Sequence, residues 1–185
     1  MSARPSDVSN PEESLILVDE QDNEIGSCAK VDCHIGDGKL HRAFSVFLFN
    51  PEGKLLLQQR SESKMLWPLY WANSCCSHPR LGEETEDAAR RRMHEELGVD
   101  CEIRFLYKFV YHANYGTTGS EHEHCWVFAG HFDGQLDINQ NEIADVKFLS
   151  PDELTQAIEA NSEHYSPWLK LEWERIRQDF LDGLI

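Results

Sequence analysis

The sequence has no long run of apolar residues and no apolar segment at its start. The first 14 residues, MSARPSDVSNPEES, are polar, and no stretch approaches the roughly 20 apolar residues that a membrane-spanning helix needs. Internal repeats and low-complexity linkers are also missing. These absences argue against a secreted or membrane-inserted protein. We therefore expect a cytoplasmic protein with reduced thiols.

Positive charge is scarce. The chain has 17 Lys and Arg residues against 33 Asp and Glu residues, which gives a formal net charge of -16. Such a field repels nucleic acid and anionic membranes, so we expect neither as a partner. The expected partner is a small molecule. A phosphate site in this chain would have to be a local exception, built from particular cations or a metal ion.

The cysteine pattern lacks the spacing of a structural zinc site. Six cysteines are present, but no C-x-x-C motif occurs. The stretch WANSCCSHP nevertheless places Cys75, Cys76 and His78 together. Three interpretations stay open from the residues alone: a zinc knuckle, a nucleophile with its base, or a proton-transfer site beside a metal.

The order of apolar runs and turn residues predicts one α+β domain. Residues 1–13 are typical of a flexible tail, and residues 14–185, in a chain with 41% hydrophobic residues, suffice for a core. We expect a monomer or a weak homodimer. Strands are predicted near residues 14–28, 40–49, 54–60, 102–111 and 121–132, with a tight turn at NPEG after Phe49. A helix is predicted over residues 84–98, with Thr85 as its N-cap and Gly98 at its exit. Two more helices are predicted to begin at the capping box SPDE, residues 150–153, and at Ser166-Pro167, the last with an apolar face that reaches Phe180.

The segment EHEHC, residues 121–125, is the most informative strand. Because side chains alternate along a strand, Glu121 and Glu123 share one face, and His122 and His124 share the other. Two carboxylates on one face repel unless a cation or proton relieves them. The pattern fits either a solvated edge strand or a divalent metal site in which a carboxylate also exchanges protons.

More metal ligands are available elsewhere in the chain. His34 and His41 flank the glycine-containing loop HIGDGKLH. Together with His78 and the two glutamates they make a set of three nitrogens and two oxygens that suits zinc, manganese or iron-like ions. Spacing alone does not show that the five residues converge.

The predicted helix after residue 84 carries paired charges. Arg91 and Glu95 are four residues apart, as are Arg92 and Glu96, so each pair shares a helical face. The pairs fit two surface salt bridges. They also fit a site in which Glu96, with Glu83 or Glu95, holds magnesium while an arginine holds a phosphate.

The residues from Ser77 to Val99, SHPRLGEETEDAARRRMHEELGV, resemble a Nudix box. Residues that match or nearly match its pattern are Glu83, Arg91, Met93, Glu95, Glu96, Gly98 and Val99. Ser77 replaces the leading glycine, and Arg92 replaces the glutamate that follows the arginine. In Nudix pyrophosphohydrolases that glutamate belongs to the metal-binding set used in hydrolysis. A cation there argues for holding a diphosphate intact.

Flanking motifs are similar to those of one Nudix family, the type I isopentenyl-diphosphate isomerases. WANSCCSHP resembles the family's W-T-N-x-x-C-x-H-P, EHE resembles its paired E-x-E, and YSPW resembles its late S-P-W. The resemblance runs from about Leu15 to Trp173. It implies a Nudix-type α/β/α sandwich with a mixed sheet and extra terminal helices and strands, and interconversion of isopentenyl and dimethylallyl diphosphate.

The resemblance also implies residue roles. Cys76 and Glu123 would exchange protons with the alkene. Glu123, with help from Tyr111, would supply one proton, and Cys76 would remove another. Trp168 would face the cation-like intermediate. His34, His41, His78, Glu121 and Glu123 would bind one divalent metal, Mn²⁺ or Zn²⁺. Glu96 would share Mg²⁺ with the diphosphate, which Lys30, Arg60, Lys64 and Arg92 would hold. Cys75 would be packing, and Glu83 and Glu95 would support their helix.

Two rival functions follow from the same residues. A Nudix pyrophosphohydrolase acting on a nucleotide-like diphosphate would release phosphate. A non-catalytic zinc-binding interaction module would bind stoichiometric zinc and lose its fold on chelation.

Overall fold

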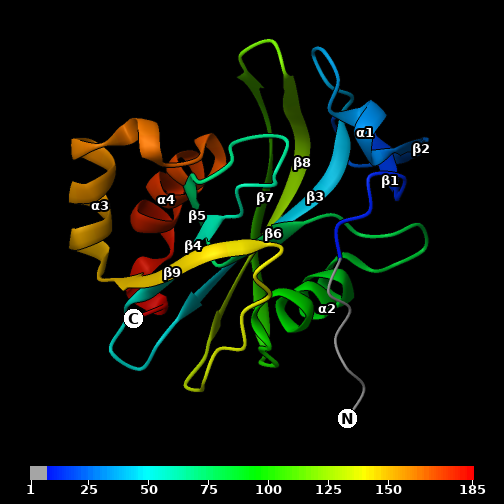
Figure 1. Ribbon diagram of the computed structural model, residues 1–185. Coiled ribbons are helices and arrows are strands. Elements are labelled where there is room, and N and C mark those ends of the chain that lie inside the picture. The colour runs from blue at the N-terminus through cyan, green and yellow to red at the C-terminus, as the bar shows by residue number, and fades with distance from the viewer. Residues whose placement is uncertain (1–7) are drawn as a thin grey trace.

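The computed structural model describes residues 8–185 (Figure 1). Its strands are β1 Ser14–Val18, β2 Glu24–Ala29, β3 His41–Phe49, β4 Leu55–Arg60, β5 Trp71–Ala72, β6 Cys75–Ser77, β7 Ile103–Tyr115, β8 Gly119–His131 and β9 Ile143–Leu149. Its α-helices are α1 Lys30–Cys33, α2 Thr85–Leu97, α3 Pro151–Ala160 and α4 Pro167–Asp179. Short 3₁₀ turns cover Ser162–His164 and Leu181–Gly183.

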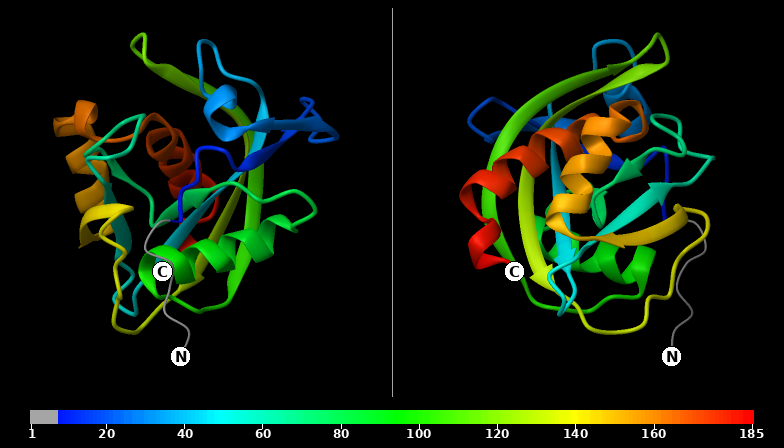
Figure 2. Two further views of the ribbon diagram at one scale, coloured as in Figure 1. Left: turned by 45° about the vertical axis from the view of Figure 1, so that its right-hand side comes forward. Right: turned by 90° about the vertical axis from the view of Figure 1, so that its left-hand side faces the viewer.

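A mixed sheet lies between two layers of helix. The strands run in the order β2-β1-β3-β4-β5, while β6 and β8 also pair with β3, β7 pairs with β8, and β9 pairs with β4. The β3–β8 pairing is parallel and the other pairings are antiparallel. Figures 1 and 2 show α2 on one face of the sheet and α3 with α4 on the other. The predicted α/β/α sandwich is therefore confirmed.

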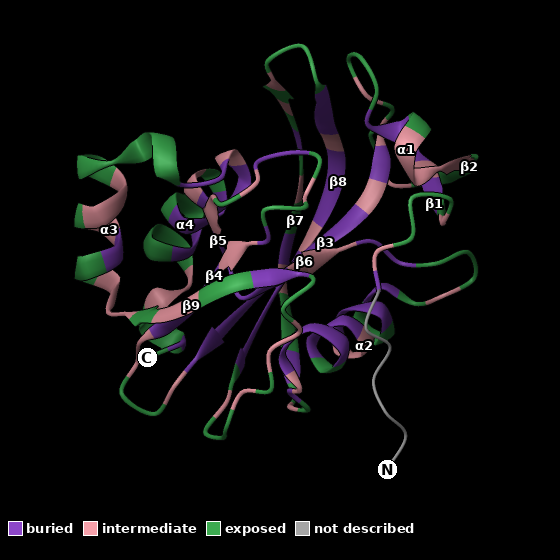
Figure 3. Cartoon of the chain, viewed as in Figure 1, coloured by how far each residue is buried: buried purple, intermediate pink, exposed green. Residues whose placement is uncertain are grey.

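Alternation along β3 divides the core into two layers. Phe44 and Val46 pack against α2, in a cluster that includes Met93. Phe47 and Phe49 face the opposite way, in a cluster that includes Trp173 of α4. These residues are at most 3% exposed. A strand with a helix layer on each face is buried along most of its length, and Figure 3 shows the central strands largely in the colour of buried residues.

Two helix starts can be compared with the sequence. Ser150 caps α3 with the predicted capping box, accepting from the Glu153 N–H while Glu153 accepts from the Ser150 N–H. For α2 the expected N-cap, Thr85, is wrong: Thr85 is the first helical residue, and Glu84 precedes it. Gly98 ends α2 at φ 68°, the left-handed conformation that favours glycine.

The predicted tail is partly structured. Residues 8–13 contact the domain: Val8 is 7% exposed, and the Glu13 and Pro11 carbonyls accept from the N–H groups of Lys30 and Val31. The remainder of the predicted tail, residues 1–7, lies outside the described residues. Within residues 8–185, none of the helices has the length and apolar character required to cross a membrane.

Candidate active site

Strand register brings the candidate catalytic residues to one face of the sheet. Glu123 of β8 pairs with His41 of β3 and with Tyr111 of β7, and Cys76 of β6 pairs with Ser45 of β3. Directly paired residues project to the same face of a sheet. Cys76, Glu123 and Tyr111 therefore share the face that α4 covers, where Tyr111 packs in a cluster with Trp168.

Five residues offer ligand atoms to one point on this face. Each atom lies within 4.8 Å of the others, and the residues are His34, His41, His78, Glu121 and Glu123. The structure thus brings together the whole set of side chains that the sequence suggested as ligands. They come from the end of α1, the start of β3, the segment after β6, and β8.

Backbone carbonyls fix the orientation of two of these imidazoles. His34 Nδ1 lies 2.6 Å from the Lys30 carbonyl, and His41 Nδ1 lies 2.7 Å from the Lys39 carbonyl. A carbonyl only accepts, so each Nδ1 carries hydrogen and each neutral ring presents a lone pair at Nε2. This second-sphere arrangement is typical of metal-binding histidines.

These Nε2 atoms lie against atoms of other candidate ligands. His34 Nε2 is 2.8 Å from Glu121 Oε2, an atom that is buried without a hydrogen-bond partner among the described residues. His41 Nε2 is 3.2 Å from His78 Nε2 and 3.7 Å from Glu123 Oε1. Facing lone pairs repel unless a proton or cation lies between them. The donor set therefore fits a divalent ion bound by nitrogen and oxygen.

The same interactions control charge at the cluster. Burial lowers the pKa of His78 far below its ordinary value, which keeps that ring neutral. Burial also acts to raise the pKa of Glu123, but its contacts with His41 and His78 outweigh burial and hold the pKa well below its usual range. For His34, burial acts to lower the pKa, and Glu121 outweighs it. These shifts favour a negative centre surrounded by imidazoles.

Glycine is required where β8 starts beside the cluster. Ser120 N–H donates to the His34 carbonyl at 2.9 Å, which brings the start of β8 against the end of α1. A Cβ at Gly119 would lie 2.3 Å from the His34 carbonyl oxygen, well inside contact distance. The absence of a side chain at residue 119 thus allows β8 to approach His34.

A cavity of about 480 Å³ opens beside the cluster. Cys76, Glu123, Tyr111 and Trp168 all line it. Tyr111 donates its hydroxyl hydrogen to Glu123 Oε2 at 2.6 Å, and burial, followed by the charge of Glu123, raises the pKa of Tyr111 well above normal. Burial raises the pKa of Cys76 to about 12, so the side chain is a thiol at neutral pH. The cavity thus brings a thiol and a carboxylate together.

Four cations line the cavity: Lys30, Arg60, Lys64 and Arg92. These are the four that the sequence assigned to phosphate binding. Lys30 is held close to Lys64 and Arg92, and its pKa is lowered by burial first and then by these like charges. A cluster of cations in a chain of net charge -16 is the local exception that a phosphate site requires.

Arg60 has a second role in shaping the cavity. Its Nε donates to the carbonyls of Leu66 and Trp67 at 3.2 and 3.1 Å, and its guanidinium lies 5.1 Å from the centre of the Trp168 ring. Trp67 adopts a left-handed backbone at φ 47°. The arginine thus stabilises an unfavourable turn that carries the apolar residues Met65 and Leu66 into the cavity wall.

Glu96 is the one proposed metal ligand that lies outside the five-residue cluster. Its carboxylate pairs with the guanidinium of Arg92, and Gln58 Nε2 lies 3.4 Å from its Oε2. It does not line the cavity, whereas Arg92 does. Arg92 replaces the family's glutamate and occupies the position between Glu96 and the cavity.

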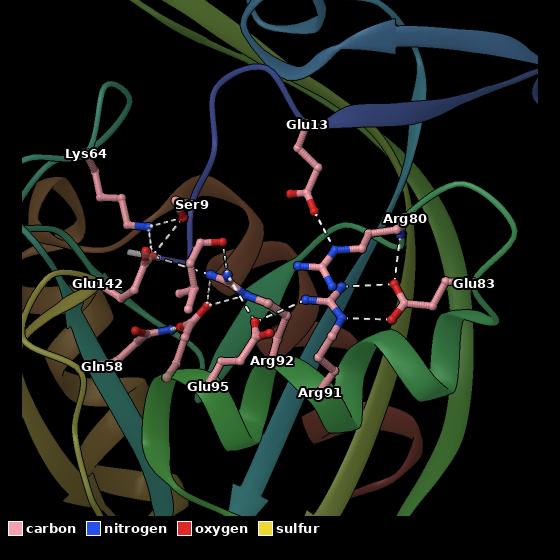
Figure 4. A network of polar contacts seen from close by, with 12 residues as sticks. Ser9, Glu13, Gln58, Lys64, Arg80, Glu83, Arg91, Arg92, Glu95 and Glu142 are labelled. Carbon is pink, nitrogen blue, oxygen red and sulfur yellow. Dashed lines mark hydrogen bonds and ion pairs between the residues drawn. The ribbon is translucent and has the colours of Figure 1, made fainter. Parts of the chain in front are cut away.

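Glu142 is a cavity residue that the sequence analysis missed. It is 2% exposed, pairs with Lys64, and lies 3.4 Å from Arg92 Nη2 and 2.9 Å from Ser9 Oγ (Figure 4). The Val8 carbonyl accepts from Arg92 Nη1 at 2.7 Å. No sequence motif surrounds Glu142, and the segment around Ser9 was expected to be a tail, so no local signal indicated either contact.

Glu172 of α4 is a second missed acid. It is fully buried, Cys125 Sγ lies 3.5 Å from its Oε1, and its Oε2 has no hydrogen-bond partner among the described residues. Burial raises the pKa of Glu172 to about 8. An acidic residue in an otherwise apolar helix face is the only sequence signal that could have indicated it.

Comparisons with known proteins give the chain a family. The NUDIX domain model matches residues 39–170. Isopentenyl-diphosphate Delta-isomerase 1 of Photorhabdus laumondii subsp. laumondii is 44% identical over 174 residues, covering 93% of this chain and 99% of that protein. Isopentenyl-diphosphate Delta-isomerase 2 of Aromatoleum aromaticum is 44% identical over 165 residues, covering 89% and 87%.

Solved structures agree on the fold. A crystal structure from Deinococcus radiodurans superposes with a TM-score of 0.74 at 29% identity, covering 88% of this chain and 98% of that one. The MutT protein of Methanosarcina mazei Go1 gives a TM-score of 0.64 at 15% identity, covering 76% and 94%, and so supports the fold alone. This chain belongs to the NUDIX domain family and, within it, to the isopentenyl-diphosphate delta-isomerases.

Proposed function

We propose that this protein interconverts isopentenyl diphosphate and dimethylallyl diphosphate by moving the carbon–carbon double bond. The observation that carries the proposal is the pairing of a half-buried thiol, Cys76, with a buried carboxylate, Glu123, in one cavity beside a metal-ligand cluster. Moving a double bond requires adding a proton at one carbon and removing one at another, with no change to the diphosphate. A thiol and a carboxylate in one cavity provide these two functions.

The pair carries one transferable proton. At neutral pH we expect Cys76 to be a thiol and Glu123 a carboxylate, because burial raises the pKa of the first while His41 and His78 lower that of the second. This state suits the conversion of dimethylallyl diphosphate to isopentenyl diphosphate, in which Cys76 donates a proton and Glu123 removes one. With the proton on Glu123, assisted by Tyr111, the same pair runs the opposite direction.

The surroundings of the pair favour a cation-like intermediate. Trp168 lines the cavity, and an aromatic face stabilises a desolvated cation by about 2 kcal/mol or more. Leu66 and Tyr111 limit access of water, which would otherwise capture a carbocation. The negative centre at Glu121 and Glu123 adds a favourable electrostatic contribution.

Two divalent ions complete the proposal. Mn²⁺ or Zn²⁺ suits the cluster of three histidines and two glutamates, and when bound it supplies charge that tunes the acidity of Glu123. Mg²⁺ suits the diphosphate, with Glu96 as its protein ligand. Because Arg92 pairs with Glu96 in this structure, we expect Arg92 to turn toward the phosphates when Mg²⁺ binds.

Lys30, Lys64 and Arg92 would hold the diphosphate itself. In the structure Glu142 neutralises Lys64 and Arg92, and these cations hold the pKa of Glu142 below its usual range although burial acts to raise it. A diphosphate carries more charge than one carboxylate and binds guanidinium groups in a bidentate manner. It can therefore replace Glu142 as their partner.

Phosphorus NMR separates this proposal from pyrophosphate hydrolysis. Incubation with Mg²⁺, Mn²⁺ and isopentenyl diphosphate should convert the alkene, seen by proton NMR, while both phosphorus signals remain those of an intact diphosphate ester. Release of inorganic phosphate or pyrophosphate would instead support the hydrolase. Stoichiometric zinc binding with turnover of neither substrate would support the interaction module.

A further inference from the structure

A carboxyl group lies in the buried face of α4. The buried residues of this helix are Trp168, Leu169, Glu172, Trp173 and Ile176. Glu172 is fully buried and lies one turn after Trp168, so the two side chains share a face of the helix. Acidic side chains are almost never fully buried unless they are paired. The partners of Glu172 therefore decide its charge state.

The carboxyl group of Glu172 has few partners. Its Oε1 lies 3.5 Å from Cys125 Sγ, and its Oε2 is buried with no hydrogen-bond partner among the described residues. Within residues 8–185, no lysine, arginine or histidine forms an ion pair with it. A buried carboxylate without a cation is strongly disfavoured, whereas the carboxylic acid is neutral. The geometry therefore favours the acid, with its hydrogen on Oε2.

The titratable side chains that face Glu172 bring no positive charge. They are Cys125 and Glu123 of β8, Cys76 of β6 and Tyr107 of β7. The Tyr107 hydroxyl donates to the backbone carbonyl of Glu172 at 3.2 Å, so its hydrogen is already used. None of these groups relieves a negative charge on the Glu172 carboxyl.

Two guanidinium groups beside α4 are turned toward aromatic rings instead. Arg60 lies 5.1 Å from the centre of the Trp168 ring, and Arg175 lies 4.0 Å from that of Tyr107. Burial above all, with the like charge of Glu123, accordingly raises the pKa of Glu172 to about 8, although hydrogen bonds to its carboxyl act in the opposite direction.

The contacts of Glu172 also join α4 to the strands around the cavity. Cys125 packs in one cluster with Trp168, and its Sγ lies 3.5 Å from Ser45 Oγ. Ser45 pairs in turn with Cys76 across β3 and β6. Glu172 thus lies where α4 docks on the sheet behind the cavity, one turn from the tryptophan in the cavity wall.

We propose that Glu172 is a positioning residue: as a neutral acid it keeps α4 docked on the sheet with Trp168 at the cavity, and its ionisation releases this part of the helix. An ionised carboxyl here would be buried near Glu123 with no cation to relieve it, so the helix would have to move to admit water. The importance of Trp168 for turnover rests on the proposed function, whereas the docking of the helix does not.

Unfolding measured against pH tests the charge state of Glu172. Because its pKa is raised in the folded chain, the stability that its proton contributes is complete below the ordinary pKa of a glutamate and is lost as the pH rises to the folded value near 8. Relative to Glu172→Gln, whose amide stays neutral, the unfolding equilibrium constant of the full-length wild-type chain should rise about tenfold per pH unit between about pH 5 and 8. Urea unfolding at each pH measures it.

A matched control lies two residues further along the same helix. Glu174 is exposed, so Glu174→Gln should keep the wild-type dependence of unfolding on pH. If Glu172→Gln does not fold, Glu172→Met takes its place, because methionine has a similar size and no charge.

The indole N–H of Trp168 tests the release of the helix. It donates to Asn73 Oδ1 at 3.1 Å in the structure. Its signal in ¹H–¹⁵N spectra is assigned by its loss in Trp168→Phe. We expect this signal to shift with a midpoint near pH 8 in the wild-type and Glu174→Gln proteins, and to stay in place in Glu172→Gln.

Either of two results would overturn the inference. Equal dependence of unfolding on pH in the wild-type and Glu172→Gln chains would show that residue 172 carries no such proton. A Trp168 signal that stays fixed in the wild-type protein through pH 8 would show that ionisation does not release the helix. Neither measurement uses isomerase turnover, so their outcome is separate from that of the proposed activity.

Discussion

At the scale of single residues, the two adjacent cysteines occupy different environments. Cys75 faces α2 and is fully buried in the cluster around Met93, whereas Cys76 projects to the opposite face and lines the cavity. The alternation of a strand is sufficient to separate them. The role of each cysteine is therefore indicated by the face of the sheet on which it lies, and not by its neighbours in the sequence.

Substitution of the two cysteines should have unequal effects. We expect Cys76→Ala to lower kcat about a thousandfold or more, since it removes one member of the proton-exchanging pair. Cys75→Ala should keep most activity and cost about 1 kcal/mol of unfolding free energy from lost packing. Steady-state kinetics and urea unfolding measure these effects. Equal loss of activity in both variants, or full activity of Cys76→Ala, would contradict the assignment.

The metal cluster supports a second prediction at this scale. Glu121→Gln should lower bound Mn²⁺ or Zn²⁺ and activity together, because an amide replaces a charged ligand. Metal content by atomic spectrometry, alongside kinetics, measures the effect. The matched control is His122→Gln, on the same strand but the opposite face, which should keep its metal. Unchanged metal content in Glu121→Gln would exclude residue 121 as a ligand.

At the scale of elements, α2 is a scaffold for the cation wall. Arg91 Nε and Nη2 lie 2.7 and 2.9 Å from the two oxygens of Glu83, which ties the helix to the loop before it (Figure 4). Burial acts to raise the pKa of Glu83, but the hydrogen bond and charge of Arg91 outweigh it and lower the pKa. The next residue of the helix, Arg92, points into the cavity instead.

The Glu83–Arg91 pair predicts a pH-dependent contribution to stability. Arg91→Ala should cost about 1 kcal/mol of unfolding free energy at pH 7, where Glu83 is ionised in both states. Because the folded pKa of Glu83 is lowered, the difference from wild type should vanish as the pH falls through that value. The exposed Arg177→Ala on α4 is the control. A difference that persists in strong acid would contradict this account.

The sequence predicted more of the fold than of the candidate site. Hydrophobic alternation, the NPEG turn after Phe49 and the capping box at Ser150 depend on nearby residues, and the corresponding elements are as expected. The candidate ligands could be picked out by residue type, but their assignment to one metal ion came from the resemblance. Glu142, Glu172 and the contacts of residues 8–13 were missed because they depend on pairing between distant segments, for which the local sequence carries no pattern.

At the scale of the whole molecule, net charge opposes compactness. A formal charge of -16 on one chain produces self-repulsion that salt screens, with a Debye length of about 10 Å at 0.1 M ionic strength. We expect added sodium chloride to raise the midpoint of thermal unfolding by a few degrees. Differential scanning calorimetry measures it, and a midpoint that falls with salt would contradict the expectation. The oligomeric state, expected to be a monomer or a weak homodimer, stays a prediction, which light scattering can measure.

Isotope incorporation tests the central claim, that a thiol and a carboxylate exchange protons with carbon while the phosphates stay attached. The protein is incubated in deuterium oxide with Mg²⁺, Mn²⁺ and isopentenyl diphosphate, and product deuterium is located by NMR. The account predicts deuterium in dimethylallyl diphosphate at the carbon that gains a proton, and none with the Cys76→Ala protein. Product without deuterium at that carbon, or equal incorporation by Cys76→Ala, would contradict it.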